Sequence, residues 1–334
     1  MSGAGAAAGA AGAGGSAPGG SGGTDGGLAG TGGGSGRGGV GAAGAGGMTP
    51  VGGQGGTSAG GAAAGGASGG AGAGGSGGAP KPPARPSAGC GKPLPATGTS
   101  AAPLTVANHD YYVKVQASYD ANTPYPMVIV FNGTADRLNW GELNAGYEGR
   151  ASIRVYANPS NTSAGWSVND LSFFTPLYDQ LTSSFCVDTA RVFASGSDSG
   201  GTFVDILGCE YARVLRAVAF SGSKELTTHP LDPAQRSCTG QVAAIVIHSP
   251  QDRIVRPEGG DKARDFYLAV NHCGTATAPL ARYSGSPSYC VQYQGCDEGF
   301  AVSWCPHTDP TYADTYHGWP SFAGPMTWSL FSSY

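Results

Sequence analysis

The sequence predicts an α/β domain, in which a mostly parallel sheet carries helices on both faces, preceded by a disordered Gly/Ala-rich tether. Two observations support this fold class. Residues 1–80 contain 38 of the 60 glycines and 20 alanines, whereas the remainder has the mixed composition of a globular domain. In that remainder, short apolar runs of strand length alternate with stretches of helical periodicity, which is typical of a parallel sheet with crossover helices.

The first 80 residues are expected to form a tether rather than a domain. They contain no aromatic residue, no cysteine and only two charges, Asp25 and Arg37. Such a segment cannot bury enough apolar surface to offset the entropy of ordering it. Residues 81–103 are expected to be a Pro-rich linker, extended locally by its prolines. The folded domain is therefore expected to span residues 104–334.

The elements of the domain follow from its apolar patterns. Residues 111–115 alternate, as a strand does, and residues 126–131 form the continuous apolar run of a strand buried on both faces. The other expected strands are 152–156, 191–195, 215–220 and 242–247, with a hairpin of 290–294 and 302–305. The expected helices are one that follows Asp170 and carries the stripe Phe173, Phe174, Leu177 and Leu181, then 200–209, 259–271 and a last helix after residue 320.

Charge and motif content exclude several functional classes. The net charge of −4 and the lack of a Lys/Arg run argue against nucleic acid as a partner. No apolar run reaches the length of about 18 residues that a membrane span needs. There is no CxxC pair and no HExxH motif, so neither a metal site nor a cofactor is expected. We expect a monomer.

The eight cysteines all lie after residue 80, and an even number favours disulfides formed in an oxidising compartment. Cys90 is expected to tie the start of the domain to its body. Cys186 precedes the strand at 191–195 and Cys209 ends the next helix, so a fold-back of residues 187–190 would favour a Cys186–Cys209 bridge. The recorded start has no signal peptide pattern, so we expect an export signal upstream of it and an extracellular or cell-surface protein.

The most informative segment is the end of the strand at 191–195. It runs into Gly196-Ser197-Asp198-Ser199-Gly200, immediately before a helix. This is the context of a nucleophile elbow, G-x-S-x-G, in which a sharp strand-to-helix turn exposes the nucleophile. The residue that matches the nucleophile is Asp198 instead of serine.

The partners that such a nucleophile needs follow in the appropriate chain order. Asp252 lies in the loop after the strand at 242–247, where the triad acid is expected, and His317 lies in a loop before the last helix. The loop after residue 131 contains Gly133 and Thr134, which are expected to supply oxyanion donors together with the residue after the nucleophile, Ser199.

The domain resembles the secreted α/β-hydrolase esterases that include polyhydroxybutyrate depolymerases, feruloyl esterases and acetyl xylan esterases. The resemblance covers most of 104–334. The matching residues, in chain order, are Tyr111–Val115, Tyr125-Pro126, Asp170 with Phe173-Phe174, Cys186–Asp188, Arg191–Phe193, Gly200-Gly201, Leu207–Glu210 and His317–Pro320. It implies a polymeric or aryl carboxylic ester as substrate, in the polyhydroxyalkanoate, feruloyl or acetyl-polysaccharide class. The sequence departs from the family in two places: family members have serine at position 198, and usually His-Gly in place of Asn132-Gly133.

An aspartate at the nucleophile position leaves three interpretations. In the first, the elbow is shifted by one residue and Ser199 is the nucleophile. In the second, Asp198 forms an alkyl ester, as in haloalkane dehalogenases and epoxide hydrolases. In the third, the domain has lost its chemistry and binds a polymer or glycan. Attack of Asp198 on an ester would form an anhydride, which is uphill, and its charge would repel the developing oxyanion. Three aromatic residues are expected to line a substrate cleft: Trp140, Trp166 and Trp319.

Overall fold

The computed structural model describes residues 83–334, except 227–228, 281–286, 288 and 310–313. The tether expected at residues 1–80 lies outside the described residues. The segment from residue 83 lies against the body of the domain: Ser87 N donates to Val187 O at 2.9 Å, and Gly89 N donates to Thr182 O at 2.8 Å. No helix among the described residues has the length and apolarity needed to cross a membrane.

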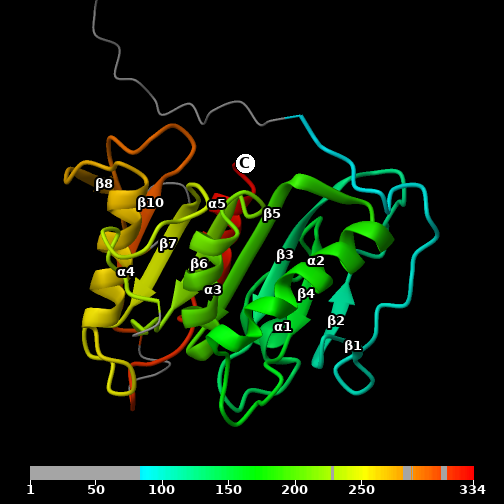
Figure 1. The fold of residues 1–334 in the computed structure, drawn as a ribbon, viewed down its shortest axis with the longest axis horizontal. Coiled ribbons are helices and arrows are strands. Elements are labelled where there is room, and N and C mark those ends of the chain that lie inside the picture. The colour runs from blue at the N-terminus through cyan, green and yellow to red at the C-terminus, as the bar shows by residue number, and fades with distance from the viewer. Residues whose placement is uncertain (1–82, 227–228, 281–286, 288, 310–313) are drawn as a thin grey trace, which may run out of the picture. The chain divides into compact units, whose positions relative to one another are not determined.

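One sheet forms the centre of the domain (Figure 1), and its ten strands in the described residues follow the order β1-β2-β4-β3-β5-β6-β7-β10-β9-β8. The six strands from β4 to β10 are parallel, and the strands at both edges are antiparallel. Their bounds are β1 Leu104–Val106, β2 His109–Lys114, β3 Tyr125–Phe131, β4 Ile153–Ala157, β5 Val187–Ser197, β6 Ala217–Ser221, β7 Ala243–His248, β8 Thr277–Pro279, β9 Val291–Tyr293 and β10 Val302–Pro306.

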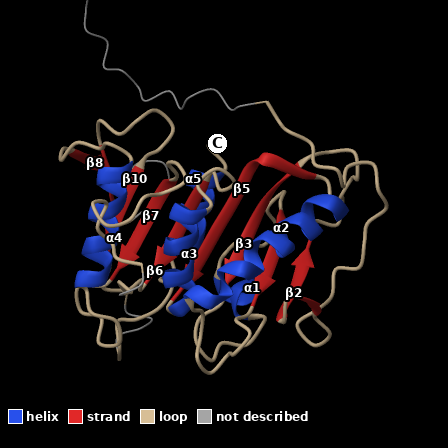
Figure 2. Ribbon diagram, viewed as in Figure 1, coloured by secondary structure: helices blue, strands red, loops and turns tan. Residues whose placement is uncertain are grey.

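Helices cover both faces of this sheet (Figure 2). Their bounds are α1 Trp140–Asn144, α2 Leu171–Ser184 after a short 3₁₀ turn at Val168–Asp170, α3 Ser199–Glu210, α4 Glu258–Val270 and α5 Ala323–Phe331. Helices α2, α3 and α4 pack on one face of the strands, and α5 packs on the other.

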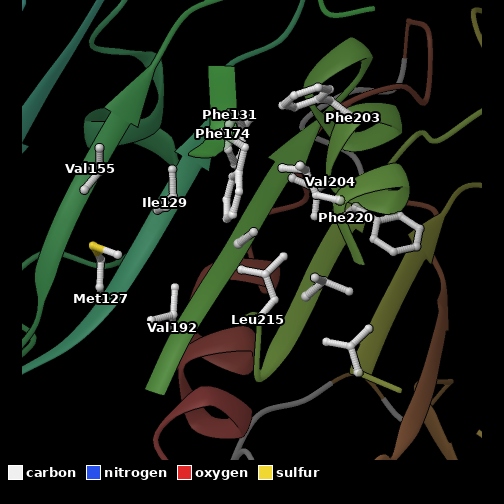
Figure 3. Packing of buried hydrophobic residues seen from close by; sticks show 14 of the residues in the cluster. Met127, Ile129, Phe131, Val155, Phe174, Val192, Phe203, Val204, Leu215 and Phe220 are labelled. Carbon is white, nitrogen blue, oxygen red and sulfur yellow. The ribbon is translucent and has the colours of Figure 1, made fainter. Parts of the chain in front are cut away.

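The two faces follow from the alternation of side chains along each central strand. In β3, Met127 and Ile129 face the layer of α2, α3 and α4, whereas Val128 and Val130 face α5. All four are completely buried or nearly so. Figure 3 shows Met127 and Ile129 on the same side of the sheet as the aromatic ring of Phe203 from α3. The continuous apolar run in the sequence is thus a strand covered on both faces, as predicted.

The predicted α/β fold class is confirmed, and most expected elements agree with the structure to within a few residues. The exception is the strand expected at 191–195, which begins at Val187 and is much longer. The expected C-terminal hairpin is present as β9 and β10, which pair antiparallel. The sheet order places the carboxyl ends of β3, β5, β6 and β7 side by side, and functional groups in α/β folds gather at that edge.

Four disulfides connect the described cysteines: Cys90–Cys186, Cys209–Cys238, Cys273–Cys296 and Cys290–Cys305. The predicted attachment of the domain start through Cys90 is confirmed. The predicted Cys186–Cys209 bridge is wrong. It required residues 187–190 to fold back, but these residues begin the 11-residue strand β5. That strand is about 36 Å long, whereas the 12-residue helix α3 runs back only about 18 Å.

Candidate active site

The turn between β5 and α3 places Asp198 at its apex. Asp198 has φ 57° and ψ −126°, a conformation that non-glycine residues rarely adopt and that is typical of strained functional turns. Glycines on either side make this turn sterically feasible. A Cβ atom on Gly196 would lie 2.5 Å from Gly200 O, and one on Gly200 would lie 2.1 Å from Phe131 O. The structure therefore places the side chain of residue 198 where the elbow motif presents its nucleophile.

His317 joins Asp198 to Asp252. Its Nε2 lies 3.1 Å from Asp198 Oδ1, and its Nδ1 lies 2.7 Å from Asp252 Oδ2. The backbone amides of Ile254 and Val255 each donate to Asp252 Oδ1 at 2.8 Å, so the acid is held from both of its oxygens. The three side chains are thus linked by hydrogen bonds, with His317 between the other two, as in a nucleophile–histidine–acid triad. In the sequence, His317 is 119 residues from Asp198 and 65 residues from Asp252.

The charges of the three groups stabilise one another. Burial disfavours the imidazolium, but the carboxylates of Asp198 and Asp252 outweigh it and raise the pKa of His317 to about 9. Burial also disfavours both carboxylates. Even so, hydrogen bonds from His317 and from backbone amides lower the pKa of Asp198 below its usual range. For Asp252, hydrogen bonds from His248, from His317 and from backbone amides lower the pKa in the same way. At neutral pH the site therefore holds an imidazolium between two carboxylates.

The second carboxylate oxygen of Asp198 accepts a hydrogen bond from a backbone amide expected to bind an oxyanion. Thr134 N donates to Asp198 Oδ2 at 2.8 Å, and the backbone amide of Ser199 also bonds to this carboxylate. Gly133 N is engaged elsewhere, because it donates to Asp136 Oδ2 at 2.7 Å. Two of the three amides expected to bind an oxyanion thus bind the side chain of Asp198, and the third binds a neighbouring carboxylate.

Ser199 is the first residue of α3, one position past the apex of the turn. Its Oγ is buried and has no hydrogen-bond partner among the described residues. A Cβ atom on Gly165 would lie 2.5 Å from this Oγ, so the hydroxyl is close to the backbone of the loop before α2. His317 Nε2 bonds to Asp198 and not to Ser199.

The three tryptophans lie in different environments. Trp166 is buried, and its Nε1 donates to Asn132 O at 2.8 Å. Trp140 is half-buried at the start of α1 and lines a cavity with Asp198 and His317. Trp319 is 3% exposed, belongs to the core that α5 covers, and lines neither of the cavities beside Asp198.

Two cavities flank Asp198, and both include Thr134 in their walls. The first, here called the Lys224 cavity, has a volume of about 250 Å³. Its walls are Thr134, Ala164, Trp166, Ser167, Val168, Asp198, Ser199, Thr202, Lys224, Leu226 and Val255. The second, here called the Asp136 cavity, has a volume of about 190 Å³ and is lined by Thr134, Asp136, Trp140, Ser197, Asp198, His317 and Gly318. A ligand on either side would therefore lie against Asp198.

The sequence interpretation did not identify three polar residues near this site. His248 ends β7, and its Nε2 lies 3.2 Å from Asp252 Oδ2; its position four residues before the expected acid was the available signal. Asp136 follows Gly133 by three residues, and burial together with the charge of Asp198 raises its pKa. Lys224 has no sequence signal, because only the fold places it in the wall of the same cavity as Asp198. Among the described residues, no group of three or more His, Cys, Asp or Glu side chains is arranged to hold a metal ion.

Comparisons with known proteins identify esterases as relatives. No family model matches the chain. Feruloyl esterase D of Neurospora crassa is 29% identical over 275 residues, which are 75% of this chain and 91% of that protein. Feruloyl esterase C of Emericella nidulans is 24% identical over 268 residues, which are 73% of this chain and 90% of that protein. Among solved structures, an acetyl xylan esterase from Aspergillus awamori is 13% identical, with a TM-score of 0.44 over 67% of this chain and 94% of that chain.

The similarity to feruloyl esterase D covers most of both chains, and the mostly parallel sheet, whose strand β5 ends in an elbow, fits an α/β-hydrolase fold. The similarity supports a carboxylic ester hydrolase, whose substrates are esters. The four disulfides suggest an extracellular protein. The chain is therefore similar to feruloyl esterases over about three quarters of its length, and these relatives support an esterase family of that type.

Proposed function

We propose that this domain recognises carboxylic esters at the cleft around Asp198, and that Asp198 itself withholds acyl transfer. The ligand class is that of the relatives, feruloyl or acetyl esters on a polysaccharide, or the related polyhydroxyalkanoates. In this proposal the domain works outside the cell or at its surface, held by the tether at residues 1–80. The observation that carries the proposal is the position of the Asp198 carboxylate between His317 and the Thr134 amide.

Electrostatics support the view that Asp198 disfavours ordinary acyl transfer at this site. An ester carbonyl develops negative charge in the transition state and needs the amides that Asp198 Oδ2 already occupies. Placing that charge about 3 Å from the Asp198 carboxylate would cost about 5 kcal/mol at an effective dielectric constant of 20. The Thr134 and Ser199 amides would each offer a hydrogen bond of about 1.5–3 kcal/mol, but both already donate to the Asp198 carboxylate and are not free to offset this repulsion. His317 is also protonated at neutral pH and cannot serve as the base.

The geometry offers no support for Ser199 as a substitute nucleophile, because His317 Nε2 bonds to Asp198 and Ser199 Oγ has no partner among the described residues. The remaining machinery, in contrast, is favourable for a serine at position 198. His317, Asp252 and the Thr134 amide already surround that side chain. The substitution Asp198→Ser would remove the charge that blocks the oxyanion position and lower the pKa of His317.

The test is steady-state hydrolysis of p-nitrophenyl acetate and methyl ferulate by four proteins: wild type, Asp198→Ser, Asp198→Ser with His317→Ala, and Ser199→Ala. We expect wild type and Ser199→Ala to be inactive, and Asp198→Ser to gain activity that the His317→Ala change removes. Wild-type activity that Ser199→Ala abolishes would overturn the proposal. An inactive, correctly folded Asp198→Ser protein that also binds no ester would overturn it as well.

A second candidate function uses Asp198 as a nucleophile toward saturated carbon. The supporting observation is that its two oxygens have different partners: Oδ1 faces His317, and Oδ2 accepts a hydrogen bond from the Thr134 amide. Oδ1 would attack an alkyl carbon and form a neutral Asp198 ester. The leaving group would depart from that carbon with the bonding electron pair. Loss of the Asp198 charge would lower the pKa of His317, which could then take a proton from water.

Water, after losing a proton to His317, would next attack Cγ of the Asp198 ester, with the charge on Oδ2 stabilised by the Thr134 amide. The bond from Cγ to the alkylated oxygen then breaks, and the alkoxide takes the proton from His317 and leaves as an alcohol. This candidate predicts a covalent intermediate that accumulates when His317 is replaced. Incubating His317→Gln with alkyl halides and epoxides, followed by peptide mass spectrometry, would detect alkylation at Asp198. An unmodified Asp198 peptide throughout the series would refute the second candidate and leave the first unaffected.

A further inference from the structure

The two cavities beside Asp198 differ in charge. Among the residues that line the Lys224 cavity, Lys224 is the one with a cationic side chain and Asp198 the one with an anionic side chain. The charge of Asp198 is already matched by His317 and by the Thr134 amide. The Asp136 cavity instead has two carboxylates and the shared imidazolium. A ligand that crosses Asp198 therefore meets uncompensated positive charge on one side only.

The backbone of Lys224 has a fixed position in the wall. Its N–H donates to Thr202 Oγ1 of α3 at 3.2 Å. On its other side, Gly259 of α4 packs so closely that a Cβ atom there would lie 3.1 Å from Lys224 Cα. Two helices thus hold the residue at the cavity, while its side chain remains exposed.

The ammonium group of Lys224 has no ion pair or hydrogen bond among the described residues. The adjacent carboxylate of Glu225 is engaged by Lys262 and by the Leu231 amide. Lys224 thus differs from Lys262, which has its own counter-charge. A lysine whose charge is not matched within the protein is available to an anionic ligand.

The rest of the cavity wall defines the body of such a ligand. Trp166, Val168 and Val255 supply apolar surface, and the indole N–H of Trp166 is already used by Asn132 O. An apolar or aromatic group with a carboxylate at its far end would contact these side chains and reach Lys224.

We infer that Lys224 is a specificity-determining residue, which selects esters that carry a carboxylate on the group lying in the Lys224 cavity. This inference rests on the proposed function, because it names the ester class that the same cleft prefers. Monoesters of aromatic dicarboxylic acids, and esters whose acid or alcohol part bears a second carboxylate, belong to this class. The effect is moderate, because the ammonium group is exposed to water. We expect the Kd of an ester with the second carboxylate to be about two- to fivefold lower than that of its uncharged counterpart, and this difference to decrease with added salt.

The test compares two nearly isosteric ligands, methyl 4-carboxycinnamate and methyl 4-carbamoylcinnamate, which differ by one negative charge. Their Kd values would be measured for wild type, Lys224→Gln and Lys262→Gln by NMR titration at low and at physiological salt. Lys262→Gln is the matched control, because it removes a nearby surface charge that does not line the cavity.

We expect wild type and Lys262→Gln to prefer the anionic ligand, and Lys224→Gln to bind the two ligands equally. Equal affinities in wild type, or a preference that survives in Lys224→Gln, would overturn the inference. Binding of neither ligand would overturn both the inference and the proposed recognition of esters. Hydrolysis by Asp198→Ser separates the two claims: turnover of both ligands with the same KM would contradict the inference but support the proposed function.

Discussion

His317 should have an unusually high pKa that depends on Asp198. The change that tests this is Asp198→Asn, which removes the negative charge but keeps an oxygen near His317 Nε2. The structure gives a pKa of about 9 against an ordinary value of 6.5, a rise of about 2.5. Two carboxylates, at 2.7 and 3.1 Å, produce this rise against the opposing effect of burial. Removing one of them should lower the pKa by at least about one unit.

The same shift predicts how stability depends on pH. A rise of about 2.5 in the pKa of His317 corresponds to about 3 kcal/mol of stabilisation of the folded state. Solvent screening reduces this value little, because the His317 side chain is only 12% exposed. The folded-state pKa is above the unfolded one, so this contribution is complete below pH 6.5. It is lost as the pH rises through 6.5 to 9. In Asp198→Asn the contribution is smaller and is lost over a narrower range.

Proton NMR of histidines labelled with ¹³C at Cε1 measures the pKa, and His317→Gln assigns the resonance among the six histidines. Denaturant unfolding at several pH values between 6 and 9 measures the accompanying loss of stability. A wild-type His317 that titrates below pH 7, or a pKa that does not change in Asp198→Asn, would refute the proposed ion pair and with it the protonated resting state.

Two further predictions concern the framework of the site. Gly200→Ala should destabilise the fold by about 3 kcal/mol or more, because its Cβ would lie 2.1 Å from a backbone oxygen; Gly240→Ala, with its nearest atom at 3.5 Å, should change stability by less than about 0.5 kcal/mol. Thermal unfolding of both variants checks this, and equal stabilities would contradict the packing of the elbow. Replacing Cys90 and Cys186 by serine opens a loop of 96 residues and should cost about 4–5 kcal/mol in urea unfolding; an unchanged midpoint would contradict that bridge.

The sequence predicted the sheet well because buried parallel strands have a distinctive apolar pattern. The run 126–131 could only be a strand covered on both faces, and the glycines around Asp198 indicated a tight turn between strand and helix. The local pattern was sufficient to predict these two features, because strand burial and the steric limits of a tight turn act on neighbouring residues.

The disulfides and the charges around the site could not be predicted in this way. Cys186 and Cys209 are close in the sequence, but the length of β5 separates them. The segment around Cys90 lies against the start of β5 instead, and Cys90 pairs with Cys186. Lys224 and Asp136 each share a cavity wall with Asp198 because of the order of strands in the sheet, and no local pattern encodes that order. Likewise, the sequence identified an aspartate in the nucleophile position, but not that its carboxylate would occupy the oxyanion amides.

The most direct test of the account is a search for an acetyl group at position 198. Wild type and Asp198→Ser would be mixed with p-nitrophenyl acetate, quenched within the first turnover and analysed by peptide mass spectrometry. The account predicts acetylation of the peptide containing position 198 in Asp198→Ser, with a matching burst of p-nitrophenol, and neither signal in wild type. An acetyl group on Ser199 in wild type, or none at position 198 in a folded Asp198→Ser protein, would contradict it.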